Sequence, residues 1–213
     1  MRIIRSAQLA IMCEPLECRM KKILLSLSLL IPFSTYAKQP NLLDELSQLI
    51  QSRTTTAPAT ALIESAFSPN AGAEKLVLKV IHASNKSIRL AAYSFTSPTV
   101  AKALLMAKKR GVDVRVLVDE KGNKGKANLA ALNLLVNGSI PTRTISSYAI
   151  HHDKYIVSDE QHVQNGSFNY SQAAAKSNSE NVLVVWNNPD LAASFQHHWQ
   201  TRWAKGKNFR SAY

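Results

Sequence analysis

The sequence predicts an α/β fold, an α-β-α sandwich in which a mixed, largely buried sheet carries helices on both faces. Two observations predict it. Along residues 61–213, segments with apolar residues at helical spacing alternate with short runs rich in β-branched residues. Several of the strand-like runs, such as residues 112–118, 155–158 and 181–186, are mostly apolar, as expected where helices cover both faces of a sheet. No internal repeat is visible, so a single domain is expected.

Helices are expected where apolar residues recur every three or four positions; Gly111 ends the second of them and Asn137-Gly138 ends the third. The expected helices are residues 73–83, 98–109, 127–136 and 189–203. Strands are expected in the β-branched runs between them. The expected strands are residues 87–95, 112–118, 140–145, 155–158, 161–168 and 181–186. Their alternation with the helices is what an α/β sandwich requires.

The first 37 residues are expected to be a leader that is removed, not a part of the fold. Lys21-Lys22 precede an apolar run over residues 23–33, and Thr35-Tyr36-Ala37 offers small residues for cleavage. This is the order of a secretory signal peptide, with its core at residues 20–37. The apolar run is shorter than the roughly 20 residues of a membrane span. The mature protein is therefore expected in the periplasm or outside the cell, without stable membrane insertion.

Residues 38–60 are polar and are expected to form a linker or loosely attached segment, with a short helix near 42–50, before a domain at 61–213. Both cysteines, Cys13 and Cys18, lie in the leader, which leaves the mature chain without a disulfide or a thiolate nucleophile. The formal net charge of +12 favours a polyanionic partner, either nucleic acid or anionic lipid.

The most informative stretch runs from residue 152 to residue 169, where six residues follow the spacing H-x-K-x4-D-x6-G-S-x-N. They are His152, Lys154, Asp159, Gly166, Ser167 and Asn169. Residues i and i+2 of a strand point to one face, so the His and Lys share a face, as do the Ser and Asn. A two-residue turn at 159–160 would pair Ser158 with Gln161. It would set His152 opposite Ser167, whereas a longer turn would shift this register.

These side chains suit the cleavage of a phosphodiester without a metal or a cofactor. Lys154 offers a compact positive charge to the non-bridging oxygens, and Ser167 and Asn169 offer neutral donors. A neutral imidazole at His152 is a competent nucleophile towards phosphorus and would give a phosphohistidine that water later hydrolyses. The alternative interpretation is a surface hairpin whose His and Lys are merely solvated.

A carboxylate on the other ring nitrogen of the motif histidine would fix its tautomer. Asp159 is poorly placed for this, because it lies at the far end of the expected hairpin. Glu180 comes just before the next expected strand and could reach the imidazole.

The spacing resembles the signature of the phospholipase D superfamily, and flanking stretches are similar to its small secreted bacterial endonucleases, the Nuc type. Those stretches are residues 92–96, 108–114, 178–181 and 198–199, and the likeness runs from about residue 67 to residue 213. The resemblance implies that His152 is the nucleophile and that Glu180 holds it. It also implies that Lys154, Ser167 and Asn169 bind the phosphate, and that the motif Asp and Gly are structural.

The single copy of the motif bears on assembly. Cleavage needs a nucleophile and a general acid that protonates the departing oxygen. Larger members of the family carry two copies, so the resemblance implies a homodimer in which His152 of one protomer attacks and the same residue of its partner protonates. Within one chain His151 is the alternative acid, although adjacent strand residues point to opposite faces.

Other polar residues admit two interpretations each. Three lysines after the expected strand 112–118 either contact backbone phosphates or are merely solvated; they are Lys121, Lys124 and Lys126. His197-His198 could suggest a metal pair, but adjacent helix residues do not face one another. Packing beside Trp199 and Trp203 is therefore expected. Tyr93 is expected in the core or lining the site.

Three functions compete. The leading one is an exported endonuclease that cuts DNA with low sequence specificity, and RNA is left open as a second substrate. A phospholipase D or phosphatidyl transferase would use the same chemistry on phospholipids, although an amphipathic basic helix is lacking. The third is a non-catalytic nucleic-acid-binding protein with a relict site, against which the intact His152, Lys154 and Asn169 argue.

Overall fold

The computed structural model describes residues 57–211; the expected leader and the expected helix near 42–50 lie outside this range. Its strands form one eight-stranded sheet in the order β1-β7-β6-β5-β2-β3-β4-β8. Strands β2, β3 and β4 run parallel to one another, and the other neighbours are antiparallel. The predicted mixed sheet is therefore confirmed.

The elements follow one another along the chain as β1 (Leu62–Ser68), α3 (Ala73–Ala83), β2 (Ser87–Ala92), α4 (Pro98–Lys109), β3 (Asp113–Asp119), η1 (Lys121–Asn123), α5 (Lys126–Asn137), β4 (Thr142–Ile145), β5 (Lys154–Ser158), β6 (His162–Gly166), α6 (Gln172–Lys176), β7 (Glu180–Trp186), α7 (Pro189–Lys205) and β8 (Lys207–Asn208).

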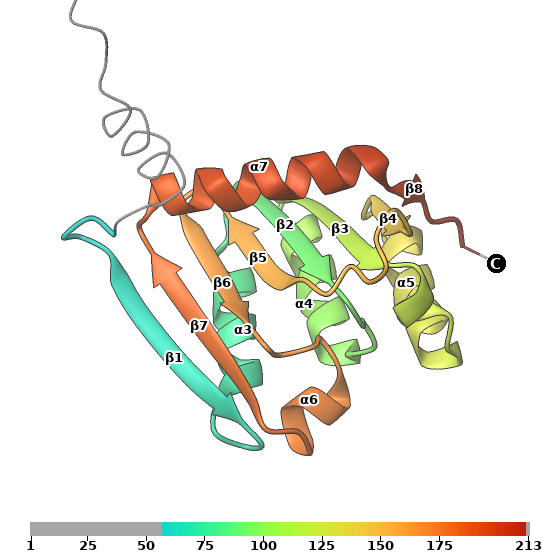
Figure 1. Ribbon diagram of the computed structural model, residues 1–213, viewed down its shortest axis with the longest axis horizontal. Coiled ribbons are helices and arrows are strands. Elements are labelled where there is room, and N and C mark those ends of the chain that lie inside the picture. Colours follow the sequence, from blue (N-terminus) through green and yellow to red (C-terminus); the bar gives the residue numbers. More distant parts are fainter. Residues whose placement is uncertain (1–56, 212–213) are drawn as a thin grey trace, which may run out of the picture. The chain divides into compact units, whose positions relative to one another are not determined.

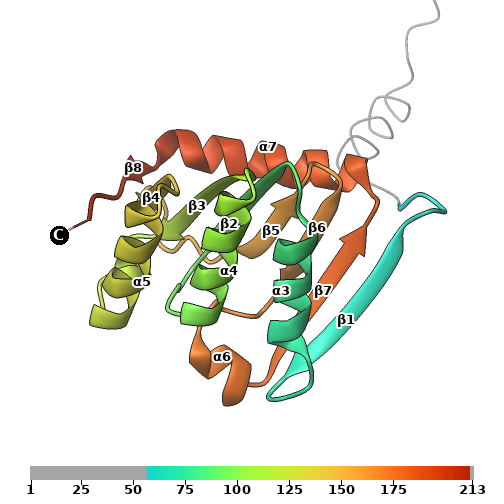
Figure 2. The same cartoon turned by 180° about the vertical axis from the view of Figure 1, so that it is seen from behind.

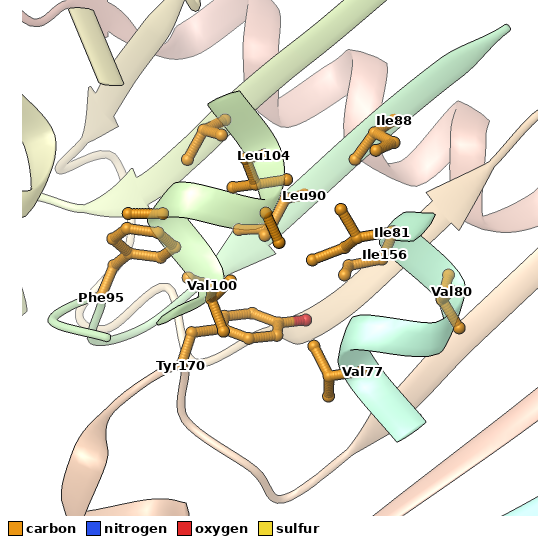
Figure 3. Packing of buried hydrophobic residues seen from close by; sticks show 14 of the residues in the cluster. Val77, Val80, Ile81, Ile88, Leu90, Phe95, Val100, Leu104, Ile156 and Tyr170 are labelled. Atoms are coloured by element: carbon orange, nitrogen blue, oxygen red, sulfur yellow. The ribbon is translucent and has the colours of Figure 1, made fainter. Parts of the chain in front are cut away.

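Helices cover both faces of the sheet, as the sequence predicts. The long helix α7 crosses one face (Figure 1), and α3, α4 and α5 lie on the other (Figure 2). The larger core lies between the sheet and α3 and α4, where Figure 3 shows Val77, Val80, Ile81, Ile88, Leu90, Phe95, Val100, Leu104, Ile156 and Tyr170. A smaller core lies under α7, where Trp199 is buried and its indole N–H donates to the Leu90 carbonyl at 3.1 Å. Because apolar side chains are buried on both faces, the sheet is rigid and can hold a site at its edge.

Several strand ends meet at one edge of the sheet. The parallel strands β2 and β3 end there, and β5 begins there because Ala92 pairs with Lys154. β6 ends and β7 begins at the same edge, where Gly166 pairs with Val182. Loops at the carboxyl ends of parallel strands are the usual place for binding residues in α/β sheets. This edge therefore brings together residues that are far apart in the sequence.

The motif hairpin has a different register from the two-residue turn considered above. Ser158 pairs with His162, so Asp159, Glu160 and Gln161 all lie in the turn. The physical reason is Gln161, whose N–H closes the turn on the Ser158 carbonyl and whose own carbonyl accepts the N–H of Asn188. The pairing of β5 with β6 is therefore shifted by one residue from the one expected. His152 lies before the first residue of β5, and Ser167 lies after the last residue of β6. These two residues are not cross-strand partners.

Candidate active site

His152 and Lys154 lie together at the sheet edge, close to one aromatic ring. His152 is exposed, and its ring centroid lies 4.8 Å from that of Tyr93. Lys154 is the first residue of β5 and is only 6% exposed. Its ammonium lies 5.4 Å from the Tyr93 ring centroid and donates to the His152 carbonyl at 2.9 Å. Tyr93 thus supports both the imidazole and the ammonium, as expected for a residue that lines the site.

The charge on Lys154 is set by opposing effects. Burial lowers the pKa of the ammonium, while the carboxylates of Glu180 and Asp153 favour its charged form. An ammonium has three donors, and the only hydrogen bond that Lys154 makes within residues 57–211 is to the His152 carbonyl. Lys154 can therefore direct further N–H groups at a phosphate oxygen.

Glu180 binds Ser167, which the sequence does not predict. The Ser167 hydroxyl donates to Glu180 at 2.6 Å and accepts the Asn181 N–H at 3.0 Å. The other carboxylate oxygen of Glu180 accepts from Asn178 at 2.9 Å. His152 makes no hydrogen bond through its ring to any residue of the described range. Here Glu180 orients the Ser167 hydroxyl and contributes negative charge near Lys154; a bond from Glu180 to the imidazole stays a prediction.

Asn169 follows Phe168 into the same edge and is half-buried. Its side-chain oxygen is buried and has no hydrogen-bond partner among the described residues. Buried polar atoms are nearly always paired, and the exceptions concentrate where a ligand or a water completes the set. This oxygen can accept a hydrogen bond from a water or from a ligand donor, whereas a phosphate oxygen would need the Asn169 amide N–H₂ instead.

Gly166 and Asp159 shape the backbone of the hairpin and its turn. Gly166 has φ 155°, and a Cβ there would collide with the Asn181 carbonyl, so only glycine lets β6 pass so close to β7. Asp159 lies at the opposite end of β5 from Lys154. Its carboxylate accepts three backbone N–H groups, from Asn85, Lys86 and Ser87, at 2.7–2.9 Å. Asp159 therefore anchors the turn to the start of β2, away from the chemistry.

The loop after β3 holds the backbone of Tyr93 through hydrogen bonds, a role that the sequence does not reveal. Asn123 is buried; its amide N–H groups donate to the carbonyls of Tyr93 and Asp119, and its amide oxygen accepts the Phe95 N–H. The Asp119 carboxylate accepts the N–H groups of Gly122 and His151. The only sequence signals that could have pointed here are the polar Asp119 at the end of a strand and an Asn in the basic loop that follows it.

The three predicted lysines of this loop, Lys121, Lys124 and Lys126, are exposed. They stand in η1, after it and at the first residue of α5, on the segment whose buried Asn123 contacts Tyr93. Their contact with a polyanion stays a prediction.

A hollow lies next to His152, between the loop before β5 and helix α7. It is lined by Tyr148, Ile150, His151, His152, Asp153, His198 and Arg202. His151 is 3% exposed, and its Nδ1 lies 3.3 Å from Asp153. Burial lowers the pKa of this imidazole. His198 forms a hydrogen bond with the Tyr155 hydroxyl at 2.9 Å and faces the hollow, so packing beside the tryptophans does not describe its surroundings fully.

Two further observations concern the residues that the structure describes. No group of three or more His, Cys, Asp or Glu among them is arranged to hold a metal ion. None of the helices in residues 57–211 combines the length and the apolar character that crossing a bilayer requires.

Comparison with known proteins places these observations in a family. Residues 77–203 match the family model described as the phospholipase D-like domain of cardiolipin synthase. A protein of Rickettsia conorii called phospholipase D is 34% identical over 140 residues, 66% of this chain and 68% of that protein. The mitochondrial cardiolipin hydrolase of Danio rerio is 29% identical over 128 residues, 60% of this chain and 55% of that protein.

Solved structures agree with the sequence relatives. Nuc from Salmonella typhimurium, a phospholipase D family member, is 50% identical and superposes with a TM-score of 0.70, covering 71% of this chain and 99% of Nuc. NucT from Helicobacter pylori has the same fold, with a TM-score of 0.63 at 20% identity over 70% of this chain and 99% of NucT. The matched residues 77–203 include the whole motif. The chain therefore belongs to the phospholipase D superfamily, in its Nuc-type branch.

Proposed function

We propose that this protein is an exported endonuclease that hydrolyses phosphodiester bonds of DNA, without a metal and with low sequence specificity. The observation that carries the proposal is the exposed imidazole of His152 beside the buried ammonium of Lys154, on one aromatic ring at a basic sheet edge. Identity of 50% to Nuc supports it. RNA presents the same phosphodiester and is a second substrate to test.

The chemistry follows from the donors and the nucleophile at this edge. A neutral ring nitrogen of His152 attacks phosphorus, so that a P–N bond forms while the P–O bond to the departing strand breaks. Lys154 stabilises the non-bridging oxygens, with the Asn169 amide N–H₂ as a further donor. The Ser167 hydroxyl has one hydrogen, which it gives to Glu180, so it donates to the phosphate only when that bond is released. A general acid protonates the departing oxygen. Water then attacks the phosphohistidine, the P–N bond breaks, and the conjugate base of the acid takes the proton from water.

The general acid is the motif histidine of a second copy in this proposal. His151, the alternative within one chain, is buried against Asp153, and its Nε2 is enclosed and without a partner among the described residues. It cannot reach a departing oxygen at the exposed face of His152 without leaving this position. A homodimer with a shared site supplies the acid without such a rearrangement.

A phospholipase D or phosphatidyl transferase activity is the second candidate. The observation in its favour is the set of Rickettsia relatives called phospholipase D, at 32–34% identity. The same His152 and Lys154 would act on the single phosphodiester of a phospholipid. The two functions therefore differ in the substrate that the surrounding surface admits, not in the reacting groups.

One experiment separates the two candidates. Purified mature protein is incubated in EDTA with plasmid DNA and, in parallel, with phosphatidylcholine vesicles. We expect plasmid cleavage in chelator and little release of choline. His152→Ala should lose at least about 10³-fold in rate. His82→Ala, which removes an exposed histidine at the far end of α3, is the matched control and should cleave as the wild type does.

The outcome assigns the function directly. Cleavage that stops on chelation, or that survives in His152→Ala, contradicts the metal-free phosphohistidine mechanism. Choline release that outpaces plasmid cleavage selects the phospholipase instead.

Export is the part of the proposal that rests on residues 20–37 alone. The full-length chain should appear in the periplasm or medium, with a mature N-terminus at Lys38 by mass spectrometry. Retention of an unprocessed chain in the cytoplasm would overturn this part.

A further inference from the structure

The hollow beside His152 has a basic rim on the α7 side. Arg202 lines the hollow and places its guanidinium 5.4 Å from the ring centroid of Tyr148. Lys205, one turn further along α7, places its ammonium 5.2 Å from the same ring and donates to the Tyr148 hydroxyl at 3.3 Å. Two cations thus lie near the Tyr148 ring, and one of them, Arg202, lines the hollow that His152 also lines.

Neither cation has an acidic partner. Within residues 57–211, the ion pairs of arginine and lysine side chains are those of Lys79, Arg89 and Arg115, and Arg202 and Lys205 form none. Arg202 donates to the Thr201 hydroxyl, which leaves most of its donor groups unused. The one carboxylate of the hollow, Asp153, lies against His151 and His198. Two like charges near one ring repel each other, and an anion bound close to both would offset that cost.

The chemistry of the rim fits a phosphate. One guanidinium group can bind a phosphate through two parallel N–H···O hydrogen bonds, and a lysine ammonium adds a compact positive charge. The hollow adjoins His152, so one substrate molecule can reach both. A nucleic acid strand carries a phosphodiester at every nucleotide, so a strand held at His152 must lead a neighbouring phosphate across an adjacent surface.

We propose that Arg202 and Lys205, held by Tyr148, form a second phosphate subsite that binds a phosphodiester flanking the scissile one in a nucleic acid strand. This inference rests on the proposed nuclease function and adds to it the residues that favour a polymeric substrate over a single diester. Arg202 is the principal ligand because it lines the hollow, and Lys205 contributes from the rim.

The test compares two substrates that differ in flanking charge. One is bis(4-nitrophenyl) phosphate, a single diester, and the other is a single-stranded oligodeoxynucleotide of ten nucleotides. In Arg202→Gln, the ratio of kcat/KM for the oligonucleotide to that for the small diester should fall about tenfold, mainly through KM. Lys205→Gln should lower the ratio less. Lys109→Gln, which removes an exposed lysine at the far end of α4, should leave the ratio unchanged.

A chemical cycle identifies the bound group. Neutral methylphosphonates in place of the phosphates that flank one scissile linkage should lower the wild-type kcat/KM by a factor similar to the Arg202→Gln change. The two changes should not multiply, because both remove one interaction. Effects that multiply in full, or a ratio that Arg202→Gln leaves unchanged, overturn the subsite. Wild-type protein that hydrolyses the small diester but no oligonucleotide overturns the nuclease function, and the subsite with it.

Discussion

Tyr93 is the residue on which the geometry of the reacting groups depends most directly. Its ring contacts His152, and the Lys154 ammonium lies over it. The backbone of Tyr93 is held by Asn123, whose amide donates to the Tyr93 carbonyl at 2.6 Å. Gly122 lies close to Tyr93; a Cβ there would lie 2.9 Å from the ring and 3.0 Å from the Tyr93 carbonyl oxygen. A change at Gly122 should therefore reach the nucleophile through Tyr93.

Gly122→Ala should reduce activity more than stability. The added methyl group must displace the Tyr93 ring, and displacements near 1 Å at a reacting group cost up to about 100-fold in rate. We expect kcat for plasmid or oligonucleotide cleavage to fall about 10- to 100-fold, while urea unfolding shows a loss of about 1 kcal/mol or less.

Gly111→Ala is the matched control. Gly111 has φ 92°, and a Cβ added there would meet no atom within 4 Å, so alanine strains only the backbone at the far edge of the sheet. It should lower stability by about 1 kcal/mol and leave kcat unchanged. Equal kcat values for the two variants would show that Tyr93 does not position His152.

His151 makes stability depend on pH. Burial lowers the pKa of its imidazole below the ordinary 6.5, although Asp153 and Asp119 oppose this. The unfolded chain therefore binds more protons than the folded one as pH falls below that value. The contribution of His151 is present above pH 6.5 and is lost as pH falls through the folded-state pKa.

We expect His151→Gln to lose less unfolding free energy than the wild type between pH 7.5 and pH 5.5, as measured by urea titration at both pH values. The comparison within each protein removes the direct cost of the substitution. An identical fall in both proteins would mean that His151 does not titrate in this range.

At the scale of elements, helices were predictable because their ends carry local signals. Helix α4 begins at Pro98 after Ser97, whose hydroxyl accepts the Val100 N–H, and α7 begins at Pro189 after Asn188, which caps it in the same way. Strand β1 was not predicted, because its apolar residues come in adjacent pairs, Leu62-Ile63 and Ala66-Phe67, and do not alternate with polar ones. Its existence depends on pairing with β7, which no local pattern encodes.

The candidate site likewise contains a part that the sequence predicts and a part that it does not. The motif residues belong to one short hairpin and its ends, so their spacing alone brings His152 near Lys154. Glu180, Asp119 and Asn123 join them only through the order of strands in the sheet. The hairpin register was not predictable either. It depends on a hydrogen bond from the Asn188 N–H to the Gln161 carbonyl, and Asn188 lies far along the sequence, just before α7.

Asp159→Asn tests whether the motif carboxylate joins two elements or takes part in the reaction. The substitution keeps a side chain that tolerates φ 54° but removes the charge that binds three backbone N–H groups before β2. We expect a loss of about 1–3 kcal/mol in the free energy of unfolding. The value of kcat should not change.

Glu160→Gln, at the next turn position, should change stability by less than about 0.5 kcal/mol. A large fall in kcat for Asp159→Asn, in protein that remains folded, would place this carboxylate in the mechanism.

At the scale of the whole molecule, the described domain carries the motif once and so offers one motif histidine, His152. The formal net charge of +12 and the exposed lysines beside the site favour approach to a polyanion. Two chains that share a site would bring two motif histidines to one phosphodiester. The proposal therefore predicts a particular dependence of activity on the composition of mixed dimers.

Wild-type protein is refolded together with His152→Ala in known ratios, and cleavage is measured at fixed total protein. If each reaction needs His152 from both protomers, mixed dimers are inactive and activity follows the square of the wild-type fraction. An equal mixture should then retain about a quarter of the full activity, against about half for independent chains. Mixtures with His82→Ala should show full activity at every ratio, because that variant keeps the site intact. A linear dependence on the wild-type fraction would mean that one chain supplies both nucleophile and acid, and the search for the acid would return to His151 and the hollow under α7.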